Sequence, residues 1–279
     1  KENSPFEFPI RSLTLYDTYD LMSPADKYLT NNKDNVFESF RTQSVKQMYY
    51  YSSHKLEFKY ETEWGLNYTA SINIENDRPT GDLHFIPVTA TPNADGVYPE
   101  IRRIHTSELS ATLGYCPNQT YINTKQRRLT INLDAPVFSI NHVFGLKDVL
   151  GGDYRFNYTT LDIYKRFWMK SWGKIDCYLK GGIQWNQVPY PLLITPASNL
   201  SYIVQQQCFN LINNMEFLND RYASLMWDWD FAGKLLHRIP LIRQLKWRES
   251  LGFCILWGGL SDKNNPNLPQ NWNSNTLMA

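Results

Sequence analysis

Two carboxylates with metal-binding spacing lie in the segment YASLMWDWDF, residues 222–231. Asp228 and Asp230 form a D-x-D pair, which can hold a divalent metal ion for phosphoryl or glycosyl transfer. That chemistry needs an open cleft in a nucleotide-binding α/β setting. The sequence contains no Gly-rich loop, no βαβ pattern and no neighbouring His cluster. Because residues i and i+2 of a strand share a face, a strand explains the spacing, and we predict no metal here.

A second candidate, Ser171 with Lys174, matches S-x-x-K, the nucleophile motif of penicillin-binding proteins. That motif requires a helix start with S-D-N and K-T-G partners, whereas this one falls in a predicted turn and residues 261–264 read SDKN. The five histidines show no H-E-x-x-H, and the four cysteines show no C-x-x-C. We therefore predict no catalytic residues, no metal, no cofactor and no enzymatic activity.

The charge of the chain is balanced. It has 28 basic and 27 acidic side chains among 279 residues, a formal net charge of +1. Nucleic-acid binding usually needs a basic surplus, so we expect no nucleic-acid partner. Aromatic residues make up 15% of the chain, and such residues favour interfaces that are apolar on one side and wet on the other.

The elements that must position these residues are strands, because hydrophobic and polar residues alternate with a period of two. Residues 55–75 alternate over 21 positions and predict a hairpin that turns at Glu63-Trp64-Gly65. Single slips near Pro136 and at Thr159-Thr160 predict β-bulges. The predicted strands are 46–61, 66–75, 102–115, 127–143, 153–167, 174–186, 215–231 and 246–259, with an earlier strand near 8–16.

Strands with one apolar and one polar face fit either a soluble sandwich or an outer-membrane barrel. No apolar run reaches the roughly 18 residues of a transmembrane helix; the longest candidate is 251–260. Aromatic-rich apolar faces, charged polar faces and alternating short turns and long loops favour the barrel. We predict an all-β, transmembrane antiparallel up-and-down β-barrel in the bacterial outer membrane. Residues 1–279 would be one barrel domain cut at both ends, because the chain starts at Lys1 and ends in a patternless polar segment.

The alternation also assigns side chains to the two faces of the barrel. Opposite charges inside would lock the barrel interior; alternatively they would hold an inward-folded loop or shape a pore. The predicted lumen-facing residues are Lys174, Asp176, Lys180, Asp228, Asp230, Lys246 and Arg248. The predicted lipid-facing residues are Trp185, Leu225, Trp227, Trp229, Phe231, Trp247, Phe253 and Trp257.

Several segments resemble a known family. They are TNNKDNVFESF (30–40), FGLKDVLGGDYRF (144–156), VPYPLLITPASNLSY (188–202), FNLINNMEFLNDRYASL (209–225), IPLIRQLKWRESLGF (239–253) and LWGGLSDKNNP (256–266). In the same order and at similar spacing, they resemble Bacteroidetes outer-membrane proteins of unknown function. These proteins are often named after a carboxypeptidase-regulatory-like domain, and they are similar to the BamA/TamA-type assembly barrels, whose type members have sixteen strands.

The resemblance implies that residues 186–214 form a loop folded into the lumen and that 215–231 is the strand descending from it. It also implies that the regulatory-like domain and the last barrel strands are missing here. The sequence has no V-R-G-F/Y motif, the lumenal-loop signature of the assembly barrels, so the resemblance carries the fold better than the function.

Three functions follow from this reading. The first is a non-enzymatic outer-membrane barrel related to assembly and translocation barrels, in contact with the lipid bilayer and an unidentified protein partner. The second is a passive pore or receptor for solute uptake. The third and weakest is a soluble β-sandwich that binds carbohydrate or acts as an enzyme.

Overall fold

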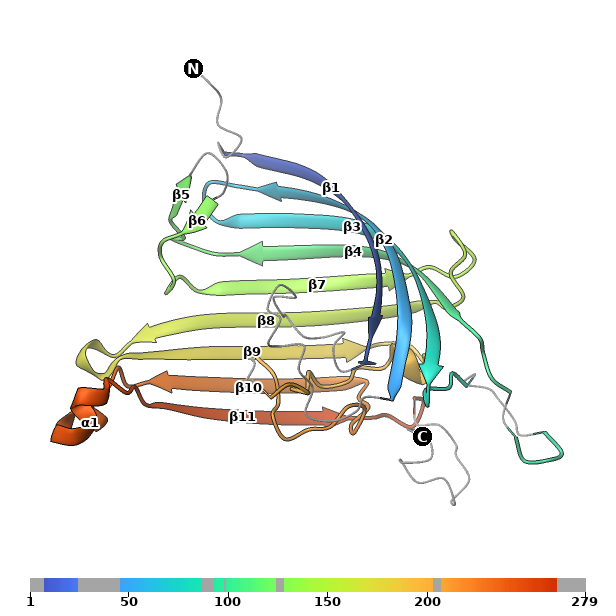
Figure 1. Cartoon of the computed structure of the whole chain (residues 1–279). Coiled ribbons are helices and arrows are strands. Elements are labelled where there is room, and N and C mark those ends of the chain that lie inside the picture. Colours follow the sequence, from blue (N-terminus) through green and yellow to red (C-terminus); the bar gives the residue numbers. More distant parts are fainter. Residues whose placement is uncertain are drawn as a thin grey trace.

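The computed structural model describes residues 8–24, 46–86, 93–97, 99–123, 128–202 and 207–264. Nine antiparallel strands form one curved sheet, in the order β1-β2-β3-β4-β7-β8-β9-β10-β11 (Figure 1). Their bounds are β1 Ile10–Met22, β2 Gln47–Glu61, β3 Leu66–Gly81, β4 Ile104–Tyr115, β7 Val137–Gly145, β8 Phe156–Trp168, β9 Lys174–Gln184, β10 Arg221–Asp230 and β11 Ser250–Gly259. The all-β, up-and-down arrangement is therefore confirmed. Among the described residues the sheet is open, with β1 and β11 at its edges, so closure into a barrel stays a prediction.

Short elements occupy the connections. β5 (Tyr121–Asn123) and β6 (Arg128–Thr130) pair as a separate hairpin between β4 and β7. The 3-10 helices are η3 (Lys170–Trp172), η4 (Tyr190–Leu192) and η5 (Leu236–Arg238), and the helix α1 spans Pro240–Leu245. No helix in the described ranges has the length and apolar character needed to cross a bilayer.

The hairpin predicted at residues 63–65 is confirmed. β2 and β3 pair from Gln47↔Gly81 to Glu61↔Asn67, and the turn closes with Thr62 N donating to Leu66 O at 2.8 Å. Gly65 has φ 88°, and a Cβ on it would lie 2.3 Å from the carbonyl oxygen of Cys116. Glycine is required here because both the backbone conformation and the space exclude a side chain.

Several predicted strand boundaries are wrong. β1 and β3 each continue six residues beyond the predicted ends at 16 and 75. The predicted strand 127–143 is interrupted: its first part holds β6, and β7 begins only at Val137, after a turn in which Asp134 N donates to Asn132 Oδ1. The strand predicted to start at 215 begins at Arg221, because the preceding residues fold over the sheet. The strand predicted to start at 246 begins at Ser250, so Lys246, Trp247 and Arg248 lie in the connection from β10.

Neither predicted bulge is present. The register runs without a skip from Val137↔Tyr164 to Gly145↔Phe156, and from Tyr158↔Gln184 to Trp168↔Lys174. The first slip, near Pro136, lies just before the start of β7 at Val137. The second arises because Phe156, at the start of β8, is an apolar residue on the polar inner face, buried against Val188 and Leu193, whereas Thr159 is a polar residue on the apolar outer face. Its hydroxyl is 2.8 Å from both His142 Nδ1 and Trp185 Nε1, and these hydrogen bonds satisfy it there.

The two faces of the sheet reverse the usual burial of a soluble protein. On one face, here called the outer face, large apolar side chains are 40–45% exposed; they include Leu56, Phe58, Ile72, Leu109, Leu113, Ile140, Leu161 and Leu179. On the opposite, inner face many polar side chains are at most 5% exposed; they include Ser53, Ser71, Glu75, Thr106, Gln184 and Ser224. Such a sheet encloses many of its polar side chains and offers its apolar side chains to the surroundings, as a membrane barrel does.

Hydrogen bonds between neighbouring strands link polar side chains of the inner face. Ser71 Oγ and Ser110 Oγ are 2.7 Å apart, and Thr112 Oγ1 donates to Asn141 Oδ1 at 2.9 Å. The apolar clusters do not lie between two sheets. They lie where the β9–β10 connection, residues 185–220, packs on the inner face: one contains Tyr49, Leu83, Phe85, Ile104 and Met215, the other Phe156, Val188 and Leu193.

Candidate functional site: a charged cavity on the inner face

A cavity of about 520 Å³ lies on the inner face of β8 to β11. Its wall carries charges of both signs, and residues from the β9–β10 connection cover part of it. The lining includes Arg166, Lys174, Asp176, Tyr178, Met226, Asp228, Asp230, Arg248 and Glu249 from the sheet side, and Gln207, Cys208 and Asn210 from the connection.

Strand register brings these charges together. Asp176 pairs with Arg166 of β8 on one side and with Asp228 of β10 on the other. Lys174 pairs with Asp230, two residues further along the same strands. Because alternate residues share a face, the four side chains of β9 and β10 all point to the cavity.

Asp176 is the most heavily engaged group in the cavity. Arg166 donates from Nε to Asp176 Oδ1 at 2.6 Å and from Nη2 to Oδ2 at 2.9 Å, a bidentate pair. Tyr164 Oη also donates to Oδ1 at 3.0 Å, and Lys174 Nζ is 3.7 Å from Oδ2. The Arg166 and Asp176 side chains are each only 13% exposed, so this pair cross-links β8 and β9 away from bulk water.

The carboxylates of the D-x-D pair have different roles. Asp230 ends its strand, since its Oδ1 accepts from Ala232 N at 2.8 Å. Asp228 stands beside Gly252 of β11 and opens into the cavity. Within the described ranges no three His, Cys, Asp or Glu side chains are grouped to hold a metal ion. The cavity therefore presents four carboxylates, of which Asp228 is the open one, beside three cations, Arg166, Lys174 and Arg248. Such a surface is suited to polar or zwitterionic segments.

The S-x-x-K residues face different partners. Ser171 lies in η3, and its Oγ accepts from Lys234 Nζ at 2.6 Å. Lys174 begins β9 and faces the cavity beside Asp176. The serine and the lysine of the motif are thus engaged separately.

Five of the seven residues predicted to face the lumen line this cavity: Lys174, Asp176, Asp228, Asp230 and Arg248. Lys180 is also on the inner face but lies further along β9, between Asp162 and Ser224 in the register. Lys246 is exposed at the C-cap of α1, with φ 52°, and does not line the cavity.

The residues predicted to face lipid lie mainly on the outer face. Leu225, Phe253 and Trp257 are 39%, 55% and 59% exposed. Trp185 follows β9 and is 55% exposed, whereas Trp247 lies in the connection before β11 and is 57% exposed.

Trp227, Trp229 and Phe231 belong to an aromatic cluster at the end of the sheet that holds the short β2–β3 and β8–β9 turns. The ring of Trp229 stacks on Phe231 with centroids 4.2 Å apart and meets Trp227 edge-on at 5.9 Å. Its Nε1 donates to the backbone oxygen of Trp172 at 2.9 Å. An indole ring with a satisfied N–H and a partly exposed body, as in Trp229, is typical of a membrane–water boundary.

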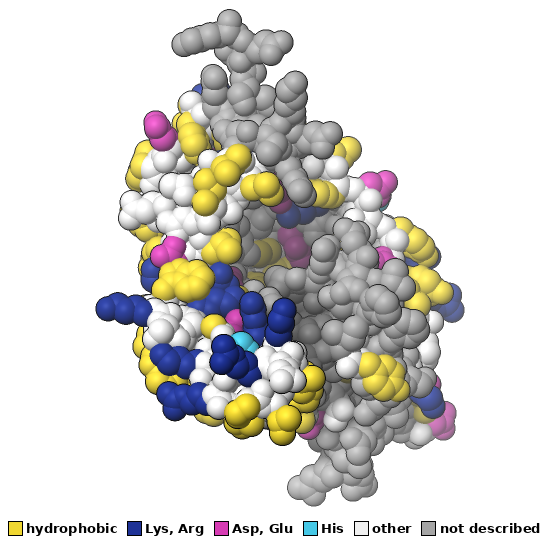
Figure 2. Space-filling view, turned by 60° about the vertical axis from the view of Figure 1, so that its left-hand side comes forward, with side chains coloured by type: hydrophobic (Ala, Val, Ile, Leu, Met, Phe, Trp, Pro, Cys, Tyr) yellow, Lys and Arg dark blue, Asp and Glu magenta, His cyan; other side chains and the backbone are white. Residues whose placement is uncertain are grey.

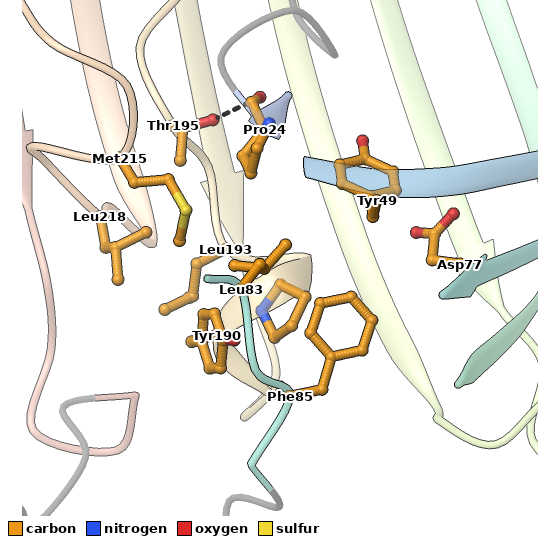
Figure 3. A pocket seen from close by; sticks show the side chains of 11 residues that line it. Pro24, Tyr49, Asp77, Leu83, Phe85, Tyr190, Leu193, Thr195, Met215 and Leu218 are labelled. Atoms are coloured by element: carbon orange, nitrogen blue, oxygen red, sulfur yellow. Dashed lines mark hydrogen bonds between the residues drawn. The ribbon is translucent and has the colours of Figure 1, made fainter. Parts of the chain in front are cut away.

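The β9–β10 connection crosses the inner face and reaches the far strands. Thr195 Oγ1 donates to Pro24 O at 3.0 Å, and Asn214 Nδ2 donates to Gln47 O at 3.4 Å. Figure 3 shows the hydrogen bond between Thr195 and Pro24, with Tyr190 and Phe85 in the same region. Tyr190 of the connection packs edge-on against Phe85, with ring centroids 6.2 Å apart. Burial raises the pKa of the Tyr190 phenol. The connection therefore joins the β1–β3 side of the sheet to the β9–β10 side.

A hydrogen-bonded cluster of polar groups holds the two ends of this connection together. Asp220 Oδ2 accepts from Ser261 N and Asn264 Nδ2, both at 3.1 Å, and from the Ser261 hydroxyl. Asn264 Oδ1 in turn accepts from Val188 N at 3.0 Å. Burial alone would raise the pKa of Asp220, but the hydrogen bonds from Ser261 and Asn264 hold it below its usual value.

Sequence reasoning missed several groups of the site. The alternation of residues 153–167 contains Arg166 and Tyr164, but the assumed bulge obscured their face. Gln207 and Asn210 carry no periodic signal, because a non-repetitive connection places them. The segment 30–40 and residues 265–279 lie outside the described residues.

Comparison with known proteins identifies the kind of sheet. A family model described as "Family of unknown function (DUF5686) C-terminal domain" matches residues 22–263. A search of curated proteins found no significant match. Among solved structures, the crystal structure of BamA from Haemophilus ducreyi lacking POTRA domains 1–3 aligns with a TM-score of 0.51 and 10% identity. The alignment covers 91% of this chain and 48% of that one, so the chain spans about half the length of the BamA structure. At this identity the similarity indicates the fold alone, of β-barrel type.

Proposed function

Because the chain belongs to the DUF5686 C-terminal domain family, we propose that it is part of a non-enzymatic, integral outer-membrane β-barrel protein of the assembly or translocation type. The observation that carries this proposal is the reversed burial of the sheet. Apolar side chains of the outer face are exposed along the strands, while many polar side chains of the inner face are buried. In water such a surface would aggregate, whereas in a bilayer it is solvated by lipid.

The proposal extends to the parent protein and its partners. We place it in the outer membrane of a Bacteroidetes bacterium, with a carboxypeptidase-regulatory-like domain before the barrel. Its contacts are the lipid bilayer and a protein client; nucleic acid is not a partner.

The β9–β10 connection supports an assembly-type barrel rather than a passive pore. It spans the inner face from Val188 to Asp220 and is held at both sides of the sheet. A segment fixed in this way would obstruct free diffusion through a closed barrel. The charged cavity next to it favours the second candidate, a pore or receptor, because mixed charges around a hydrated space can select solutes.

One reconstitution distinguishes these functions. The full-length protein is folded into lipid vesicles, and two quantities are measured: steady conductance in planar bilayers, and the folding rate of an unfolded outer-membrane protein added to the vesicles. We expect faster client folding than with empty vesicles and no steady conductance. Steady conductance without faster client folding would favour the pore. Detergent-free solubility of the folded chain would contradict both and favour the soluble sandwich.

A further inference from the structure

The β10–β11 connection, residues 231–249, is strongly basic although the chain as a whole is balanced. It carries five Lys and Arg residues, Lys234, Arg238, Arg243, Lys246 and Arg248, against one carboxylate, Glu249. Elsewhere in the chain basic and acidic residues nearly cancel. A local excess of this kind indicates an anionic partner.

Glu249 does not neutralise the surface of the connection. Its Oε1 accepts from Leu235 N at 2.5 Å and from Leu236 N at 3.4 Å, so the carboxylate holds the start of η5. Arg238, Arg243 and Lys246 remain exposed to solvent. Figure 2 shows Lys and Arg side chains gathered with hydrophobic ones on the lower part of this end of the molecule.

The same connection exposes large apolar side chains. Leu241 is 78% exposed, and Leu245 and Trp247 are each 57% exposed. Leu241 and Leu245 are four residues apart in α1 and share one face, whereas Arg243 lies on the opposite side of the helix. Basic residues beside exposed leucines and a tryptophan are typical of a segment that lies in a membrane interface.

The position of the connection matches that interpretation. It leaves β10 directly after the aromatic cluster of Trp227, Trp229 and Phe231. Lys234 Nζ contacts Ser171 Oγ and lies 4.7 Å from the ring centroid of Trp172, which ties the connection to the β8–β9 turn. The basic groups therefore lie just beyond the aromatic boundary, where lipid phosphates are found.

We propose that residues 234–248 form a binding surface for the headgroups of anionic glycerophospholipids. Arg238, Arg243 and Lys246 would contact the phosphates, and Leu241, Leu245 and Trp247 would enter the acyl boundary. This inference rests on the proposed outer-membrane function. The occupant is lipid rather than an acidic protein because the surface is continuous with the apolar outer face. The connection is also on the short-turn end, the periplasmic end of bacterial barrels, whose leaflet contains glycerophospholipids.

The test measures lipid selectivity of the full-length protein in phosphatidylcholine vesicles by electron paramagnetic resonance. Spin-labelled phosphatidylglycerol and phosphatidylcholine report the association of each lipid with the protein. The double variant R238Q/R243Q removes two exposed cations. The matched control R102Q/R103Q removes two exposed cations just before β4, at the opposite end of the sheet.

We expect the unmodified protein to prefer phosphatidylglycerol and to lose this preference at high salt, because surface charges are screened. R238Q/R243Q should lower the preference by roughly fivefold for each cation removed, whereas R102Q/R103Q should leave it unchanged. Equal association of both lipids with an inserted protein would overturn this inference alone, as would a preference lost only in R102Q/R103Q. If carbonate extracted the protein from the vesicles, both this inference and the proposed function would be overturned.

Discussion

A lysine at Leu225 tests whether the outer face of the sheet contacts hydrocarbon. Leu225 is near the middle of β10, and the register places it between Leu179 of β9 and Ile255 of β11. Its side chain is 39% exposed on the outer face. A lysine at this position would have no carboxylate beside it on either neighbouring strand.

The expected cost follows from depth in the bilayer. A lysine on the lipid face of a barrel costs about 2–4 kcal/mol at the midplane and about 0–1 kcal/mol near the interface. Leu225→Lys should therefore lower the folded-to-unfolded ratio roughly 30- to 700-fold, since 1.4 kcal/mol corresponds to about tenfold. Trp227→Lys, closer to the aromatic boundary, should cost less than Leu225→Lys but more than Asp228→Asn on the inner face.

The assay is urea-dependent folding of the full-length protein into lipid vesicles, followed by tryptophan fluorescence and heat-modifiable gel mobility. Leu211→Lys is the matched control, because it makes the same change at a residue of the β9–β10 connection that is 95% exposed. It should cost less than about 0.5 kcal/mol, as surface substitutions do. If Leu225→Lys were as mild as Leu211→Lys, the outer face would not lie in hydrocarbon and the proposed function would fail.

Three further predictions concern the inner face. Arg166→Gln should destabilise the protein by about 1–3 kcal/mol because it leaves Asp176 without its bidentate partner. In a double-mutant cycle, adding Asp176→Asn should recover part of this lost stability. Additive effects of the two substitutions would contradict the pairing. Tyr190→Ala should lower the free energy of unfolding by about 2–3 kcal/mol because it removes the contact with Phe85. Limited proteolysis should then cut residues 185–220 faster than in the unmodified protein. An unchanged rate of cleavage would mean that the contact does not hold the connection. Asp220, whose pKa is lowered in the folded state, should stabilise the fold above the unfolded-state pKa of about 3.9 and lose that contribution as pH falls through the folded value. The urea midpoint of Asp220→Asn should accordingly depend less on pH below about 4, and an unaltered acid limb would refute this role.

The sequence predicted the faces of the sheet better than the ends of its strands. Alternation in residues 174–184 and 221–230 follows from backbone geometry with a period of two, so it assigned Asp176, Asp228 and Asp230 to one face. Strand ends depend on contacts that are distant in sequence. Residues 246–248 continue the alternation, yet α1 and the left-handed Lys246 keep them out of β11.

The cavity was only partly predictable for the same reason. Its strand residues repeat every second position, but Gln207, Cys208 and Asn210 are brought in by the non-repetitive connection. The anchor at Asp220 depends on Ser261 and Asn264, more than forty residues away. No local pattern encodes such a partner, so only the folded structure reveals it.

The β9–β10 connection has a consequence for the order of folding. The main sheet pairs strands in the order of the chain, so each half can grow by adding hairpins. Two hydrogen bonds of the connection, in contrast, join residues that are far apart in the sequence. Thr195 and Pro24 are 171 residues apart, and Asn214 and Gln47 are 167 residues apart. Contacts of such high sequence separation form slowly, because closing the chain costs entropy before the contact is made. We expect the strands to pair first and the connection to join the two halves last.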